Sequence, residues 1–133
     1  MRIIAAIAGA LLGLLFLFAA AAFFFNLMGG PAPAEGSPMA AFFAAFAPTG
    51  YLAFVKVLEA VGGVLVALPW TRRLGLLILG PIIVNILAFH VFITGGQGLL
   101  EPMILVMTGL ALVLVWCERA VFAPFLPGRT PTP

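Results

Sequence analysis

Two charged residues stand in an otherwise apolar segment of the chain, within the stretch KVLEAVGG at positions 56–63. Lys56 and Glu59 are three residues apart, so on a helix their side chains share one face and can form an ion pair. A carboxylate beside an amine can bind a polar ligand and exchange protons with it. The same pair can instead serve only to fix the register of its helix. We therefore take Lys56 and Glu59 as candidate ligand-binding residues, with a structural ion pair as the alternative.

A second apolar segment contains Pro81, Asn85 and His90. Pro81 lacks the N–H that a helix interior needs, which predicts a kink in that segment. Asn85 and His90 carry hydrogen-bonding side chains, and on an antiparallel neighbouring helix they would lie at the depths of Glu59 and Lys56. They complete the candidate ligand-binding set. Their five-residue spacing corresponds to about 140° of rotation, which leaves open whether Asn85 and His90 share one pocket.

Apart from these four residues, the sequence contains few motifs that are typical of catalytic, metal or cofactor sites. Gly62 and Gly63 follow Glu59 by about one turn, where their missing side chains permit close helix packing or leave room for a ligand beside the carboxylate, and we favour packing. No Ser-His-Asp arrangement or zinc-ligand spacing occurs, so we predict no metal site and assign no catalytic residue. Cys117 is the sole cysteine, which excludes an internal disulfide and a Cys-x-x-Cys pair. Haem, iron–sulfur and nucleotide-binding motifs are also missing, so we predict that the chain holds no cofactor of its own.

The composition is that of a membrane protein. Of the 133 residues, 65% are hydrophobic and 8% are charged, which is far less charge than a soluble domain needs. The net charge of +2 is too small to indicate nucleic-acid binding. A membrane span needs roughly 20 apolar residues. Four segments qualify, at about 3–28, 51–69, 74–94 and 99–117. We predict an all-α integral membrane protein, a four-transmembrane-helix bundle over residues 1–126, with a disordered tail at 127–133.

The basic residues outside the predicted spans predict the orientation of the bundle. They flank one face, and the first and third connections contain none. These residues are Arg2, Arg72, Arg73, Arg119 and Arg129. Because basic residues accumulate on the cytoplasmic side, both termini are predicted to be cytoplasmic, in a multi-pass protein of the bacterial inner membrane. Trp70 and Trp116 fall at the same face, where tryptophan rings favour the headgroup level.

The first predicted span has an alternative interpretation as a cleaved signal peptide, because it follows a basic residue and precedes Pro-Ala-Pro-Ala. Its apolar run is longer than the roughly 7 to 15 residues of a signal core. In addition, Gly9 and Gly13 have the GxxxG spacing of packed membrane helices. We therefore favour a retained span.

The first connection contains a predicted short helix. Ser37 is a suitable N-cap, Pro38 suits the first helical position, and an Ala- and Phe-rich segment follows at 39–46. This segment can lie on the outer membrane surface, fold over the bundle, or act as an ordinary connector with aromatic anchors.

Four segments carry a family resemblance: YLxxxKVLEAVGGVLVALPW at 51–70, LILGPIIVNILAFHVF at 77–92, FFFNLMGGPAP at 23–33 and FAPFL at 122–126. On these segments the chain resembles the DoxX family of small four-helix bacterial membrane proteins. The residues that match in order and spacing are Lys56, Glu59, Gly62, Gly63, Pro81, Asn85 and His90. The resemblance implies a four-helix membrane fold. It also implies an association with thiosulfate:quinone oxidoreductase or with membrane redox complexes that handle thiol stress.

Two functions of different classes remain. In the first, the protein is the membrane subunit of a redox complex, its candidate residues line a pocket for a quinone or a small sulfur compound, and a redox partner protein completes the electron path. In the second, it is a non-enzymatic bundle that scaffolds a partner or carries a small solute or a proton on Glu59. Transport would require a homo-oligomer, because four helices leave little room for a path. Whether the protein is an enzyme stays open.

Overall fold

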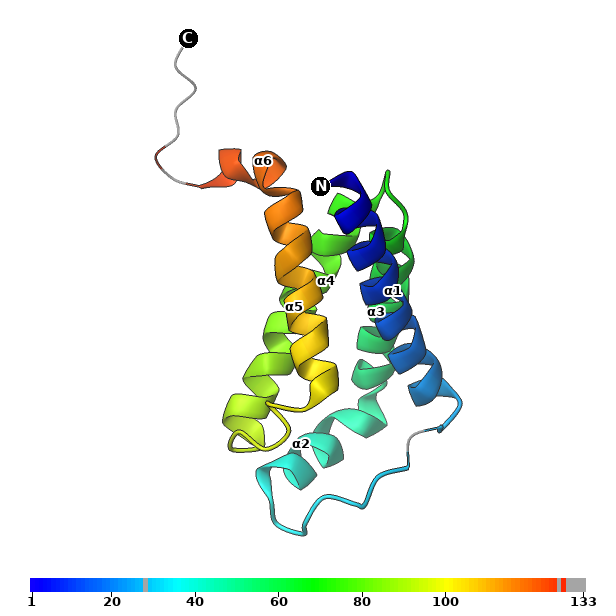
Figure 1. Ribbon diagram of the computed structural model, residues 1–133. Helices are drawn as coiled ribbons and strands as arrows, with labels where there is room; N and C mark the ends of the chain where they lie inside the picture. The colour runs from blue at the N-terminus through cyan, green and yellow to red at the C-terminus, as the bar shows by residue number, and fades with distance from the viewer. Residues whose placement is uncertain (28, 127, 129–133) are drawn as a thin grey trace.

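The computed structural model describes residues 1–27, 29–126 and 128, and all regular elements in this part of the chain are helices (Figure 1). The six α-helices are α1 (Arg2–Phe24), α2 (Pro38–Phe46), α3 (Tyr51–Ala67), α4 (Arg72–Ala88), α5 (Pro102–Cys117) and α6 (Arg119–Phe122). Tighter 3-10 turns, η1 (Ala47–Thr49) and η3 (Ala123–Phe125), follow α2 and α6, and a wider π-helical turn, η2 (Phe89–Ile93), extends α4. The predicted all-α class is confirmed. The predicted tail at 127–133 lies outside the described residues, apart from residue 128.

Four helices run side by side and form the body of the molecule. α1 packs against α3 and α5, and α4 packs against α3 and α5 (Figure 1). α2 lies across one end of this bundle, and α6 turns away from α5 at the other end, where the N-terminus also lies. The two ends of the bundle therefore differ in what covers them.

Two to four segments are candidate membrane spans. α1, with 23 residues, and the continuous helix Arg72–Ile93, with 22, are long and apolar enough to cross a membrane on their own. Two further candidates are helices joined across a sharp bend: Pro38–Thr49 with Tyr51–Ala67, at 82°, and Pro102–Cys117 with Arg119–Phe125, at 70°.

Two helix ends differ most from the predicted span boundaries. α1 ends at Phe24 rather than near residue 28, and α5 begins at Pro102 rather than near residue 99. The residues before α5 form a turn that contains three glycines with positive φ: Gly95, Gly96 and Gly98. Glu101 is then extended, at φ −61° and ψ 140°, and Pro102 takes the first helical position, where its missing N–H costs no helical hydrogen bond.

Glycines allow α1 to approach α3 closely. A Cβ atom at Gly13 would lie 2.5 Å from the carbonyl oxygen of Gly63, and a Cβ at Gly9 would lie 2.7 Å from that of Val66. Both distances are shorter than real Cβ contacts, so a side chain at either position would force the two helices apart. The interpretation of Gly9 and Gly13 as packing residues is confirmed.

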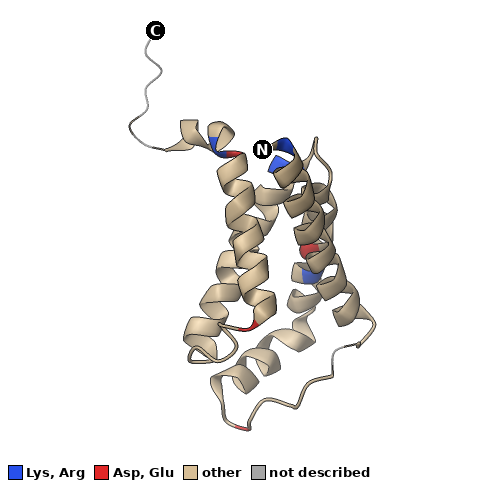
Figure 2. Cartoon of the chain, in the orientation of Figure 1, with Lys and Arg blue, Asp and Glu red and all other residues tan. Residues whose placement is uncertain are grey.

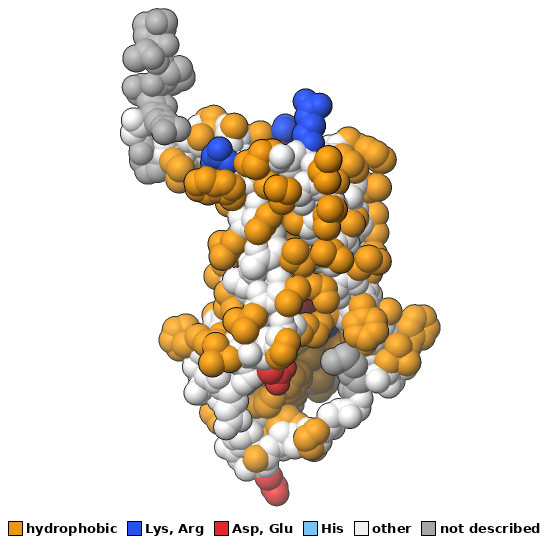
Figure 3. Space-filling view, in the orientation of Figure 1, with side chains coloured by type: hydrophobic (Ala, Val, Ile, Leu, Met, Phe, Trp, Pro, Cys, Tyr) orange, Lys and Arg blue, Asp and Glu red, His pale blue; other side chains and the backbone are white. Residues whose placement is uncertain are grey.

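The core draws on all four helices of the bundle. Its fully buried side chains Leu12, Val66, Leu79 and Leu114 come from α1, α3, α4 and α5. The outward faces are apolar too, as the orange surface of the bundle in Figure 3 shows, and Val84 for example is 66% exposed. A large apolar surface of this kind is compatible with lipid rather than water.

The short helix α2 begins as predicted. The Oγ of Ser37 accepts a hydrogen bond from the N–H of Ala40 at 3.1 Å, and Pro38 occupies the first helical position. The ring of Phe42 lies 5.0 Å from that of Phe89, which follows α4 directly. Of the three placements that the sequence leaves open, this contact supports the one in which α2 folds over the end of the bundle.

Candidate functional site

A cavity of about 230 Å³ lies between α2, α3 and the end of α4. Its lining includes all four candidate ligand-binding residues: Lys56, Glu59, Asn85 and His90. The remaining lining is apolar and largely aromatic, and consists of Phe23, Phe42, Phe43, Leu52, Val55, Ile86 and Phe89. Residues from two antiparallel helices thus meet beneath α2, and the cavity combines a few polar groups with an apolar wall, as small-molecule sites do.

Lys56 and Glu59 form the expected ion pair. The Lys56 Nζ donates a hydrogen bond to the Glu59 Oε2 at 2.8 Å. The Glu59 side chain is only 3% exposed, whereas that of Lys56 is 27% exposed. Figure 2 shows this pair as the acidic and basic positions in the middle of α3, away from the other charges. The carboxylate is therefore inside the bundle, and the amine lies between it and the α2 end.

The ion pair also lines a second cavity, of about 200 Å³, which lies toward the interior of the bundle. Lys56, Glu59 and Ile86 belong to both linings, and the rest of the second lining comes from α1 and α5. These other residues are Leu15, Phe16, Ala19, Met103, Ile104 and Met107. A small polar group can therefore reach the carboxylate beneath α2, with apolar space continuing toward the bundle interior.

His90 lies at the edge of the cavity beneath α2, in the π-helical turn. Its Nδ1 donates a hydrogen bond to the carbonyl oxygen of Ile86 at 2.8 Å. A carbonyl only accepts, so Nδ1 carries a proton and Nε2 is the nitrogen left for a ligand. A Cβ at Gly98 would lie 3.4 Å from His90 Nε2 and 3.5 Å from Glu101 Oε1. The imidazole therefore reaches both the cavity and the turn before α5.

Asn85 lines the cavity from α4, but its side chain is exposed. No hydrogen bond within the described residues involves its side-chain amide. The amide can therefore turn toward a ligand without losing a protein contact. The sequence leaves open whether Asn85 and His90 share one pocket, and both of them line this cavity.

The predicted packing residues lie outside the cavity lining. Gly62 contacts α4, where a Cβ would lie 2.7 Å from the Leu79 Cδ2, and Gly63 contacts α1. Helix contacts thus occupy the space beside both glycines. Pro81 lies within α4, which continues through it to Ala88, and its side chain is exposed.

Sequence reasoning missed the aromatic wall of the site. Phe42 and Phe43 come from α2, and their rings lie 5.0 Å and 6.1 Å from the ring of Phe89. The available signal was the Phe-rich composition of 39–46 together with Phe89 beside His90. It could not show docking, because the partner residues are more than forty positions apart.

No group of three or more metal-ligating side chains occurs within the described part of the chain. No family model matches this chain, and no curated protein or solved structure shows significant similarity to it.

Proposed function

We propose that the chain is a four-span membrane protein that binds the headgroup of a quinone, or a small sulfur compound, in the cavity at Lys56 and Glu59. It would serve as the membrane subunit of a redox complex, as its resemblance to the DoxX family implies. The observation that carries this proposal is the meeting of four polar side chains in one aromatic cavity.

Four spans require α3 and α5 to cross the membrane together with α1 and α4. α3 and α5 have 17 and 16 residues, slightly short of the roughly 20 of a typical span. A helical segment precedes α3 and another follows α5, each across a sharp bend. α1 contributes Leu12 and Phe16 to the core, which supports a retained span rather than a cleaved signal peptide.

The orientation proposal places both termini in the cytoplasm of a bacterium. Apart from Lys56, the basic residues of the described chain gather at the end that carries the N-terminus (Figure 2). A Glu35→Cys variant in a Cys117→Ser background tests this, because residue 35 lies in the first connection. A membrane-impermeant maleimide should label it in intact cells. Labelling that requires cell lysis would contradict the orientation.

The cavity suits a quinone headgroup for chemical reasons. A quinone carbonyl accepts hydrogen bonds, and Lys56 and Asn85 can donate them, whereas the Nε2 of His90 can accept one from a hydroxyl of the reduced headgroup. Reduction of a quinone takes up protons with electrons, and Glu59 supplies a buried group that can exchange them. The volume of about 230 Å³ is below the roughly 300–1,000 Å³ of sites that enclose drug-sized ligands. A headgroup fits this space, with its tail in the lipid.

Electrons must come from another protein under this proposal. The chain contains no haem ligand pair, cysteine cluster or nucleotide loop, so a redox partner would donate or accept them. The polar cavity would then orient the headgroup and manage its protons.

Native mass spectrometry of gently extracted protein tests the ligand. Wild type is compared with Glu59→Gln, and Glu35→Gln is the matched control because it removes a carboxylate outside the cavity. We expect a quinone or a sulfur compound to co-purify with wild type and Glu35→Gln and to be lost from Glu59→Gln. Absence of any bound small molecule, with no binding of added ubiquinone or menaquinone, would overturn the proposal. That result would favour the scaffold or solute-carrier alternative, in which the ion pair fixes the helix register.

A further inference from the structure

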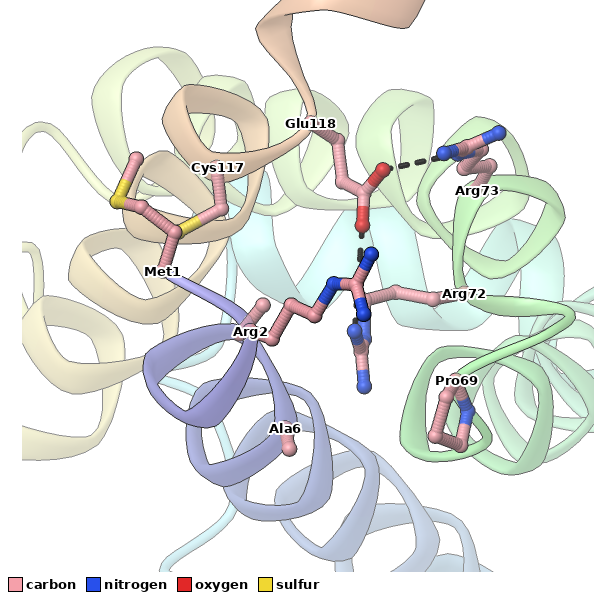
Figure 4. Close-up of a pocket in the computed structure, with 9 residues that line it drawn as sticks. Met1, Arg2, Ala6, Pro69, Arg72, Arg73, Cys117 and Glu118 are labelled. Carbon is pink, nitrogen blue, oxygen red and sulfur yellow. Dashed lines mark hydrogen bonds and ion pairs between the residues drawn. The ribbon is translucent and has the colours of Figure 1, made fainter.

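A separate cavity, of about 460 Å³, lies at the opposite end of the bundle, where α1 begins and α5 ends. Three arginines line it: Arg2 from α1 and Arg72 and Arg73 from the start of α4. Glu118, between α5 and α6, is the acidic residue in this lining. Figure 4 shows these side chains around the cavity, with Glu118 linked to Arg72 and Arg73 by dashed lines.

One carboxylate serves two of these guanidinium groups unequally. The Glu118 Oε2 accepts a hydrogen bond from the Arg73 Nε at 2.8 Å, whereas its Oε1 lies 3.9 Å from the Arg72 Nη1. The Arg73 side chain is 61% exposed and could be solvated without this pair. Glu118 therefore interacts more closely with the exposed Arg73 than with the buried Arg72. With three arginines and one glutamate in its lining, the cavity has an excess of positive charge.

Arg72 is the unusual residue of this group. It is 5% exposed, and its Nε and Nη2 have no hydrogen-bond partner within the described residues. A buried charge without such partners is costly. Its side chain lies against α1 at Gly9, where a Cβ would be 2.8 Å from the Arg72 Nε. The bundle thus makes room for a buried guanidinium, two of whose nitrogens have no hydrogen-bond partner in the described part of the chain.

We propose that this cavity binds a phosphate group. The planar guanidinium presents paired N–H donors that match phosphate oxygens, and arginine is the residue best suited to this contact. The volume lies within the range of small-molecule sites. Two sources share this chemistry, namely the headgroup of an anionic phospholipid and a soluble phosphate compound.

The lipid source has one additional observation in its favour. Trp70 and Trp116 stand beside the lining residues Pro69 and Cys117, and they are 78% and 64% exposed. Exposed tryptophans of membrane proteins favour the headgroup level. In a membrane-spanning bundle, the cavity would then open at the depth of lipid phosphates.

Binding is measured on the full chain in neutral detergent, with one arm for each source. Native mass spectrometry compares retention of phosphatidylglycerol with that of phosphatidylcholine, and equilibrium dialysis measures binding of inorganic phosphate. Preference for phosphatidylglycerol without saturable phosphate binding identifies the lipid source. Saturable phosphate binding without that preference identifies the soluble source. Failure of both probes to bind overturns the proposal.

Variants distinguish binding in the arginine-lined cavity from nonspecific attraction to the positive charge at this end of the bundle. Arg72→Gln should weaken binding of the successful probe by at least about 10-fold, because it removes charge-assisted hydrogen bonds. Glu118→Gln should strengthen binding, because it removes a competing carboxylate. The matched control is Arg119→Gln: Arg119 lies at the same end but outside the cavity lining, where it stacks on Trp116 at 4.4 Å.

If Arg72→Gln does not fold, the exposed Arg2 supplies the test through Arg2→Gln, for which a loss of about 3-fold is expected. Equal losses in Arg119→Gln and in the cavity variants would overturn the proposal, since they would reflect surface charge alone. Unchanged binding in the cavity variants would overturn it as well.

Discussion

Removing Lys56 and removing Glu59 should have unequal effects on stability. The two groups are 2.8 Å apart, but the Glu59 side chain is 3% exposed and that of Lys56 is 27% exposed. Lys56→Met leaves a buried carboxylate without its partner. Glu59→Leu leaves an amine on a flexible stem that can carry it outward to a more polar environment. The first variant should therefore be the more damaged of the two.

The burial of each group sets the expected magnitudes. Breaking a buried ion pair from one side costs about 3–5 kcal/mol. Because Lys56 is partly exposed, we expect the lower limit, about 3 kcal/mol, for Lys56→Met. Glu59→Leu should cost about 1 kcal/mol or less, as for a partly solvated pair. The double variant has neither charge and should resemble Glu59→Leu, which gives a coupling energy of about 3 kcal/mol.

The free energies are measured by reversible unfolding of the purified proteins in mixed micelles with a rising fraction of dodecyl sulfate, followed by circular dichroism. Arg73→Met is the matched control. It breaks an ion pair of the same length, 2.8 Å, but Arg73 is 61% exposed, so the loss should be below about 1 kcal/mol. Additive losses in the Lys56 and Glu59 variants would refute the coupling. Equal losses in the two single variants would refute the argument from burial.

Three further predictions concern the scaffold, and the same unfolding assay checks the first and the last of them. Gly13→Ala should destabilise the bundle by about 1–3 kcal/mol, because its Cβ meets the backbone of Gly63, whereas Gly80→Ala, which meets no atom within 4 Å, should be neutral or slightly stabilising. Ser37→Ala should remove about 1 kcal/mol of local stability from α2, seen as faster hydrogen exchange in its first turn and unchanged exchange in α1. Thr108→Val should be neutral or stabilising, because the Thr108 Oγ1 is buried without a hydrogen-bond partner in the described chain, and a clear loss would show that the hydroxyl is used.

Features that depend on local sequence could be predicted well. The apolar runs predicted α1, α3, α4 and α5 to within a few residues, because each run is long and Gly and Pro mark its ends. Ser37 and Pro38 predicted the start of α2, since capping involves residues three positions apart. The i, i+3 spacing predicted the contact of Lys56 with Glu59 for the same reason.

Features that depend on contacts between distant segments could not be predicted in this way. The aromatic wall requires α2 to dock on Phe89, and no local pattern specifies that contact. His90 lies in the π-helical turn Phe89–Ile93, which departs from regular α-helical geometry, so the direction of its side chain could not be predicted from a regular helix. The cavity lining could therefore be predicted only in part from the sequence, through its polar residues.

The burial of Arg72 could not be predicted from the number and position of basic residues in the sequence. In the sequence, Arg72 and Arg73 are adjacent positive charges that indicate one side of the membrane equally well. In the fold, α4 begins at Arg72, so the two side chains leave the first turn of the helix in different directions. One is 5% exposed and the other has a side chain that is 61% exposed. The proposed orientation uses the charge of both residues, whereas the proposed phosphate site uses the one that is buried against α1. Adjacent arginines can thus have separate roles, and only the helix packing assigns them.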